Sequence, residues 1–389
     1  MTCINEVKVS MHAQWGALLL GIIFSSITYA EQGVFSDRIV FGQSADFSAT
    51  RASLSQAYLD GAQLYFDQVN QQGGVHGRRI EIKQLDDGYQ IKTALENTQK
   101  LIHEEKVFAL IHYVGTAITE AVIPLVDKEK IPFLNPITGA NQVRMPDRFS
   151  RQVFHLRASY ADEIDRIVRQ LKVVGIERIG LVYEDETFGK TIRQLVLKSM
   201  DKNQLKLAVE GVIPFNNPDK VSEAVNAIGH KEPQAIIVGN IGPSAVNFIK
   251  AYEAVGQKAM YFTVSVANVE KLYQGLGESA RGIVISQVMP SITKTTFPIV
   301  KEYLRALASS PGTKKPSSLG IEGYLSARLI TEVLQRCGKS LSQEKFITTL
   351  ESMGRHEIGG FAVNYSSTNH NGSSFVDLGM IGLGGKLIY

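Results

Sequence analysis

The residues best suited to bind a small molecule lie in two turns, each of which follows a short apolar run. They are Val114, Gly115 and Thr116 at the end of the run 107–114, and Ile137, Thr138 and Gly139 after the run 131–135. A threonine hydroxyl donates a hydrogen bond, and glycine lets a ligand come close to the backbone. If Thr116 caps the following helix, the free N–H groups and positive dipole end of that helix add to the attraction. Both turns therefore suit an acidic group such as a carboxylate, although ordinary helix capping would explain the same residues.

Patterns for catalysis, metal binding or phosphate binding are incomplete. His356 begins a zinc-protease pattern, but Gly360 stands where the second histidine is needed. Asp86 and Asp87 end a predicted strand, and we expect a solvated pair there rather than a metal site. The glycine-rich stretch 382–386 lacks the spacing of a phosphate-binding loop. The sequence therefore predicts no catalytic residues, no metal and no cofactor.

The elements that must hold the two turns alternate between strand and helix. Strands are predicted over 37–44, 79–86, 107–114, 131–135, 178–183, 206–213, 234–239 and 260–264. Helices are predicted over 55–72, 91–104, 116–128, 160–174, 188–202, 220–229, 244–255, 297–309, 319–336 and 343–351. The strands are short and rich in Val, Ile and Leu, which favours parallel sheets covered on both faces. The alternation runs twice and predicts an α/β fold of two doubly wound parallel-sheet lobes, with a hairpin at Asn371-Gly372 in the tail.

Composition excludes several classes of protein. The 389 residues are 44% hydrophobic and 20% charged, which is typical of a globular chain. The net charge of 41 − 38 = +3 gives no electrostatic reason to expect a nucleic-acid partner. The cysteines are Cys3 and Cys337, too few for a disulfide scaffold.

Residues 1–30 are typical of a secretory signal peptide. The apolar run 15–24 lies in a stretch, 9–30, without charged side chains, and a small-residue cleavage site ends at Ala30. The alternative is a membrane anchor, but the apolar run is too short to span a hydrocarbon core of about 30 Å. Translation from Met11 is a second possibility. We expect export and a mature chain that begins near Glu31.

Ten segments, taken in order, resemble one known family. They are 41–44, 69–78, 85–88, 114–116, 136–140, 156–160, 183–189, 285–290, 321–324 and 369–373. The segment 69–78, Val-Asn-Gln-Gln-Gly-Gly-Val-His-Gly-Arg, and the Asp86-Asp87 pair are similar to signatures of the leucine/isoleucine/valine-binding periplasmic proteins, also called type I solute-binding proteins. The resemblance spans nearly the whole chain after residue 30.

The resemblance implies two lobes joined by a hinge, each made from separate segments. Lobe one would hold 31–156 and 288–355, and lobe two 157–287 and 356–389. It implies a periplasmic monomer that is not an enzyme, closes on a small polar ligand (an amino acid, an amide or a carboxylate) and delivers it to an ABC permease. A sensor that signals to a membrane kinase or cyclase is the alternative, and an exported α/β enzyme is a weaker one.

The resemblance also implies a set of ligand-binding residues. They are Phe47, Ser48, Val114, Gly115, Thr116, Ile137, Thr138, Gly139, Tyr160, Phe188, Ser265, Gln287, Glu322 and Tyr324. Among them, Thr116 would hold a ligand carboxylate and Phe188 would cover the ligand. For Tyr160, Gln287, Glu322 and Tyr324 a structural role is equally open. Residues 261–267 lack the acid that pairs with a ligand ammonium in the amino-acid binders, which disfavours a simple α-amino acid.

Overall fold

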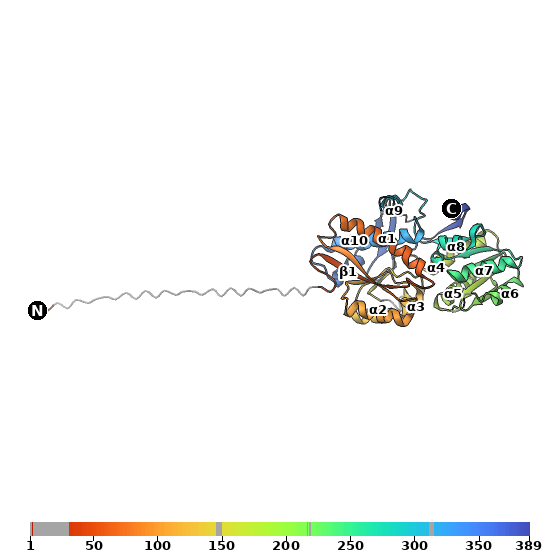
Figure 1. Cartoon of the computed structure of the whole chain (residues 1–389), viewed down its shortest axis with the longest axis horizontal. Coiled ribbons are helices and arrows are strands. Elements are labelled where there is room, and N and C mark those ends of the chain that lie inside the picture. Colours follow the sequence, from red (N-terminus) through yellow and green to blue (C-terminus); the bar gives the residue numbers. More distant parts are fainter. Residues whose placement is uncertain (1, 3–30, 145–149, 216, 218, 311–314) are drawn as a thin grey trace. The chain divides into compact units, whose positions relative to one another are not determined.

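The structure is a computed structural model, which describes residues 2, 31–144, 150–215, 217, 219–310 and 315–389 (Figure 1). Apart from Thr2, the predicted signal peptide lies outside the described residues. In the part of the chain that the structure describes, no helix combines the length and the apolar character needed to cross a membrane.

A five-stranded parallel sheet, in the order β2-β1-β3-β4-β5, forms the centre of the first lobe. Its strands are β1 (Arg38–Ala45), β2 (Arg79–Asp86), β3 (Ala109–Ile111), β4 (Phe133–Leu134) and β5 (Val153–Phe154). Its helices are α1 (Ala52–Gln71), α2 (Ile91–His103), α3 (Thr116–Glu129), α9 (Pro298–Ser309), α10 (Ser318–Cys337) and α11 (Gln343–Glu351), with the short helix η1 (Asn141–Val143). Alternate residues of β1 point to opposite faces of the sheet. Phe41 packs in the apolar cluster with α1 and α10, and Val40 packs in the cluster with α2 and α3.

A seven-stranded sheet, in the order β14-β13-β10-β9-β8-β6-β7, forms the centre of the second lobe. Its strands are β6 (Ile179–Glu184), β7 (Leu207–Ile213), β8 (Ala235–Gly239), β9 (Met260–Thr263), β10 (Val284–Gln287), β13 (Asp377–Ile381) and β14 (Leu387–Ile388). Its helices are α4 (Tyr160–Val173), α5 (Thr187–Lys202), α6 (Ser222–Gly229), α7 (Pro243–Ala254) and α8 (Val269–Leu276), with η3 (Ser265–Ala267), η4 (Gly277–Ala280) and η5 (Leu383–Gly385). Strands β13 and β14 run antiparallel to their neighbours. Figure 1 shows α2, α3 and α10 around one sheet and α5 to α8 around the other.

Helices α1 and α10 pack backbone to backbone, which fixes the first turn of α1 at the edge of the lobe. A Cβ on Gly61 would lie 1.8 Å from the carbonyl oxygen of Gly320, and one on Gly323 would lie 1.9 Å from that of Tyr58. Only glycine fits at such contacts. The start of α1, where Arg51 lies, is therefore held in place by the helix pair.

The described chain passes between the lobes three times, after β5, after β10 and after β12. The hairpin of β11 (Gly354–Ile358) and β12 (Phe361–Tyr365) shares an apolar cluster with the first lobe, through Ile358 and Phe361. We therefore propose that lobe two resumes near β13 rather than at residue 356. The other predicted boundaries, near 156 and 288, stay predictions.

The predicted hairpin at Asn371-Gly372 is wrong. The hairpin turn is at Gly359 and Gly360, whose φ angles are +57° and +83°. Asn371 instead bridges in parallel to His155. Gly372 is needed there for close approach, because a Cβ would lie 2.4 Å from the Tyr365 hydroxyl oxygen.

Candidate ligand-binding site

The carboxyl ends of the parallel strands in both sheets face each other across a cleft between the lobes. Its lining consists of Arg51, Leu54, Tyr89, Val114, Gly115, Thr116 and Ile137 from the first lobe, and Tyr160, Phe188, Ile241 and Val266 from the second. This is the place where open α/β sheets bind ligands. The space inside is only about 10 Å³, which is room for about one water molecule.

The two hydroxyl-bearing turns of the first lobe meet directly in this region. The hydroxyl oxygens of Thr116 and Thr138 lie 2.9 Å apart, and both side chains are buried. The prediction that Thr116 caps α3 is wrong, because Gly115 occupies the cap position with a φ of 106° and Thr116 is the first helical residue. The Thr116 hydroxyl therefore hydrogen-bonds to Thr138 at the cleft and does not cap the helix.

Arg51 crosses the cleft and was not predicted from the sequence. Its guanidinium donates to the Glu184 carboxylate at 2.6 Å and to the Ile241 carbonyl at 3.1 Å, both on the second lobe. Both charged side chains are only 3% exposed. The guanidinium also lies 5.2 Å from the ring centre of Tyr89, a distance typical of cation–π contacts. A buried ion pair therefore connects the two lobes at the cleft.

Charge in the cleft is set mainly by burial and by this ion pair. Burial is the largest single effect and lowers the pKa of Arg51, but the charge and hydrogen bond of Glu184, together with Tyr89 and Glu186, outweigh it. The net shift is upward, so the guanidinium stays charged. Burial raises the pKa of Glu186, which lies close to the pair. One Glu186 oxygen accepts the Phe188 N–H at 2.9 Å, and the other is buried without a hydrogen-bond partner among the described residues. Glu186 can therefore accept a donor from a ligand.

Three aspartates shape the loops at the mouth of the cleft. Asp46 accepts the N–H groups of Ala49 and Arg51, both at 2.6 Å, and so fixes the turn before α1. Asp86 accepts the N–H of Phe47 at 2.9 Å. Asp87 accepts the Ser44 hydroxyl at 2.8 Å and is 2% exposed, so the expectation that both residues of the pair are solvated is wrong for Asp87. Among the described residues, no group of three or more His, Cys, Asp or Glu side chains is placed to hold a metal.

We predict that Asp87 makes the protein less stable as pH rises. Burial raises the pKa of Asp87 from 3.8 to about 6, so between these values the folded state binds more protons than the unfolded state. The contribution of Asp87 to the free energy of unfolding should therefore fall by about 2 kcal/mol from pH 4 to pH 7. Urea unfolding of the parent and of Asp87→Asn at both pH values measures this. If the free energy of unfolding changed equally with pH in the parent and in Asp87→Asn, the prediction would be contradicted.

The structure brings together some of the predicted ligand-binding residues. Val114, Gly115, Thr116, Ile137, Tyr160 and Phe188 line the cleft. The rings of Tyr160 and Phe188 meet edge to face, with centres 5.4 Å apart. Gly139 lies beneath Tyr160, where a Cβ would come within 2.6 Å of that ring. Phe47 and Ser48 lie in the loop after β1, outside the residues that line the cleft.

The other predicted site residues lie in polar or aromatic contacts away from the cleft lining. The Ser265 N–H donates to Glu163 at 2.8 Å, and Glu322 lies 3.4 Å from Arg157. Gln287 is buried at the end of β10. The Tyr324 hydroxyl donates to the side-chain oxygen of Gln68 at 3.1 Å, within the α1–α10 contact. For these four residues the contacts favour structural roles.

Strand-end position could have identified the residues that were missed. Arg51 follows β1, Tyr89 follows β2 and Ile241 follows β8, in the same kind of loop as the predicted turns. The sequence pattern gives each loop its place at the sheet edge. It does not show that Arg51 pairs with a carboxylate 133 residues away.

The two lobes, their three connections and the cleft between strand ends define a two-lobed binding protein. The model of the family described as periplasmic binding protein matches residues 38–382, and the chain belongs to this family. The predicted α/β fold with parallel-sheet lobes is confirmed.

Individual relatives agree with this family. The chain is 19% identical to the "Leu/Ile/Val-binding protein homolog 8" of Brucella abortus, over 95% of this chain and 93% of that protein. It is 18% identical to an "Amino acid binding protein" of Pseudomonas aeruginosa, over 63% of this chain and 65% of that protein. A solved substrate-binding periplasmic protein from Ralstonia solanacearum is 28% identical, with a TM-score of 0.83 over 90% of this chain and 99% of that one.

Proposed function

We propose that the protein is a periplasmic solute-binding protein that captures a small polar ligand in the cleft by hinge closure and delivers it to an ABC importer. The observation that carries the proposal is the meeting of strand-end loops from both lobes around Arg51, Glu184 and Thr116, with only about 10 Å³ of space between them. A ligand larger than one water molecule enters only if the lobes move apart. The difference in ligand affinity between open and closed forms then drives closure.

The chemistry of the cleft supports a ligand with an acidic group. The hydroxyls of Thr116 and Thr138, the N-terminus of α3 and the guanidinium of Arg51 all favour a negative charge. The free oxygen of Glu186 offers an acceptor for an ammonium, amide or hydroxyl donor. The proposed ligand is therefore an amino acid, an amide or a related carboxylate.

Two alternatives are distinguished by the partner and by the reaction. As a sensor, the same closed form would contact a membrane kinase or cyclase instead of a permease. Permease and ATPase genes next to the gene of this protein would favour import, and kinase or cyclase genes would favour sensing. An exported enzyme would convert the ligand during incubation, whereas a binding protein returns it unchanged. Export through the predicted signal peptide and a monomeric mature form belong to this proposal.

The proposal is tested by a thermal-shift screen of residues 31–389 against amino acids, amides and small carboxylates, followed by calorimetry on the hits. X-ray scattering should give a smaller radius of gyration when the protein is saturated with ligand. If no compound binds, or a bound compound leaves the scattering unchanged, capture by closure is contradicted.

We predict that Thr116→Val weakens binding of the identified ligand by about one to two factors of ten. A hydrogen bond to a charged group contributes roughly 1.5–3 kcal/mol, and about 1.4 kcal/mol corresponds to tenfold in affinity. Valine keeps the shape of the side chain and removes the hydroxyl. Thr138→Val removes the partner hydroxyl and should also weaken binding. Calorimetric titration of each variant measures the effect.

Thr331→Val is the matched control for these variants. Thr331 is equally buried, on α10, and its hydroxyl donates to the Ala327 carbonyl at 2.8 Å, away from the cleft. The Thr331→Val variant should therefore bind the ligand with the affinity of the parent. Equal affinity in Thr116→Val, Thr138→Val and the parent would place the acidic group of the ligand elsewhere.

A further inference from the structure

A second, larger cavity lies beside the cleft, next to two of the segments that connect the lobes. It has a volume of about 440 Å³, within the range of small-molecule sites. Its lining consists of Asn141, Arg144, Ser159, Asp162, Asn364, Asn369, Asn371, Gly372, Ser373 and Ser374. Ser159 precedes α4 in the connection after β5, and Ser374 lies in the connection after β12. None of the residues predicted to bind the cleft ligand lines this cavity.

Arg144 is a buried cation in the wall of this cavity, without a carboxylate partner among the described residues. Its side chain is 9% exposed, and no carboxylate of the described residues lies within ion-pair distance. Its guanidinium donates to the carbonyls of Thr138 at 2.7 Å and Arg157 at 2.9 Å and to the side-chain oxygen of Asn371 at 3.4 Å, while Nε has no hydrogen-bond partner among the described residues. Burial, together with the nearby Arg157 charge, lowers the pKa of Arg144 to about 10. Such a charge is costly unless an anion compensates it.

The rest of the cavity wall is mostly neutral and polar. The side-chain amides of Asn141, Asn364 and Asn371 and the hydroxyls of Ser373 and Ser374 can donate hydrogen bonds. The Asn369 amide already donates to the carbonyls of Asn364 and Asn371. The carboxylate in the lining is that of Asp162, and it already accepts the Ser159 N–H at 3.0 Å and the Ser159 hydroxyl at 2.6 Å in the capping box of α4. The wall therefore offers one charged donor group and several neutral ones.

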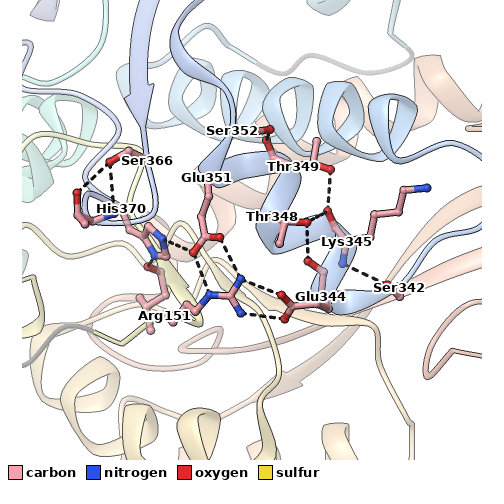
Figure 2. Close-up of polar contacts among 12 residues, drawn as sticks. Arg151, Ser342, Glu344, Lys345, Thr348, Thr349, Glu351, Ser352, Ser366 and His370 are labelled. Atoms are coloured by element: carbon pink, nitrogen blue, oxygen red, sulfur yellow. Dashed lines mark hydrogen bonds and ion pairs between the residues drawn. The ribbon is translucent and has the colours of Figure 1, made fainter.

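The turn that carries the asparagines is held rigidly against β5. The Gly372 N–H donates to the His155 carbonyl at 2.7 Å, and the His370 ring stacks on Phe154 with centres 3.7 Å apart. Figure 2 shows Arg151 between Glu344 and Glu351, and Glu351 in turn beside His370. These contacts connect the turn to α11. The cavity wall is therefore in place before a ligand arrives, which lowers the cost of binding.

We propose that this cavity binds a small oxyanion or polycarboxylate, which compensates the charge of Arg144 and is held by the surrounding asparagine and serine donors. A neutral polyol would use the same amides but would leave the buried charge as it is, so the structure favours an anion. The site lies on the connections between the lobes, and it is separate from the cleft of the proposed function.

The test uses residues 31–389 and calorimetric titration with inorganic phosphate, sulfate and citrate at constant ionic strength, with glycerol as the neutral probe. We expect saturable binding of at least one anion, at one site per chain. Asn364 has an exposed side chain in the cavity wall, so Asn364→Asp adds a negative charge without removing a buried contact. This variant should bind the anion at least tenfold more weakly.

Asn226→Asp is the matched control, because Asn226 is exposed on α6 and outside the cavity. Asn226→Asp should leave anion binding unchanged, as should Thr116→Val, because Thr116 lines the cleft and not this cavity. Saturable binding by none of the three anions, binding of glycerol alone, or equal weakening in Asn364→Asp and Asn226→Asp would overturn the proposal. Weakening by Thr116→Val would move the anion to the cleft and would also overturn it, without affecting the proposed function.

Discussion

Replacing Arg51 with methionine should lower the free energy of unfolding by about 3–5 kcal/mol, because Glu184 would remain as a buried carboxylate without its partner. The two side chains are 2.6 Å apart and almost completely buried. Methionine keeps an unbranched apolar stem of similar length and removes only the charged head. The loss is measured by urea unfolding, followed by circular dichroism.

The double variant Arg51→Met with Glu184→Leu should recover most of this loss. Replacing a buried ion pair with apolar side chains of similar volume is often neutral or stabilising. The partly exposed pair of Arg193 and Glu210, whose side chains are 36% and 34% exposed, gives the control. Arg193→Met should cost no more than about 1 kcal/mol. A loss in Arg51→Met as small as that in Arg193→Met would show that the interlobe pair contributes little.

The fold was predictable from sequence because its signals are local. Strand β2 and helix α11 begin and end at the predicted residues, since an alternation of polar and apolar residues marks the strand and a helical periodicity marks the helix. Strands β3 and β4 are shorter than predicted, because His112 and Asn135 have positive φ angles of 56° and 53° and interrupt the extended backbone. No pattern in the one-dimensional sequence marks such angles at these two residues.

The candidate site was only partly predictable because it is assembled from both lobes. The turns at Thr116 and Thr138 follow strands, and the general rule for parallel sheets places them at the cleft. The pairing of Arg51 with Glu184, and the burial of Asp87, depend on contacts between segments distant in sequence. The partners of the charged side chains in the cleft can therefore be identified only from the three-dimensional structure.

Replacing Gly115 with alanine should both destabilise the protein and abolish ligand binding in the cleft. Gly115 has φ 106° and ψ 146°, a conformation that is largely restricted to glycine. A Cβ there would lie 2.5 Å from the ring of Tyr89, which packs beside the guanidinium of Arg51. Backbone strain of about 1–3 kcal/mol and overpacking of about 1–3 kcal/mol should together cost about 2–6 kcal/mol in the free energy of unfolding.

Gly175→Ala separates the two causes. Gly175 also has a positive φ, +73°, but no atom lies within 4 Å of the position of its Cβ. This variant therefore carries backbone strain without overpacking, and it should cost about 1 kcal/mol and bind ligand as the parent does. In Gly115→Ala, by contrast, Tyr89 must move, and Arg51 loses the ring against which it packs. Calorimetry below the unfolding temperature of each variant measures binding independently of stability. Parent-like affinity in folded Gly115→Ala would mean that the cleft tolerates a displaced Tyr89 and that the ligand does not depend on this wall.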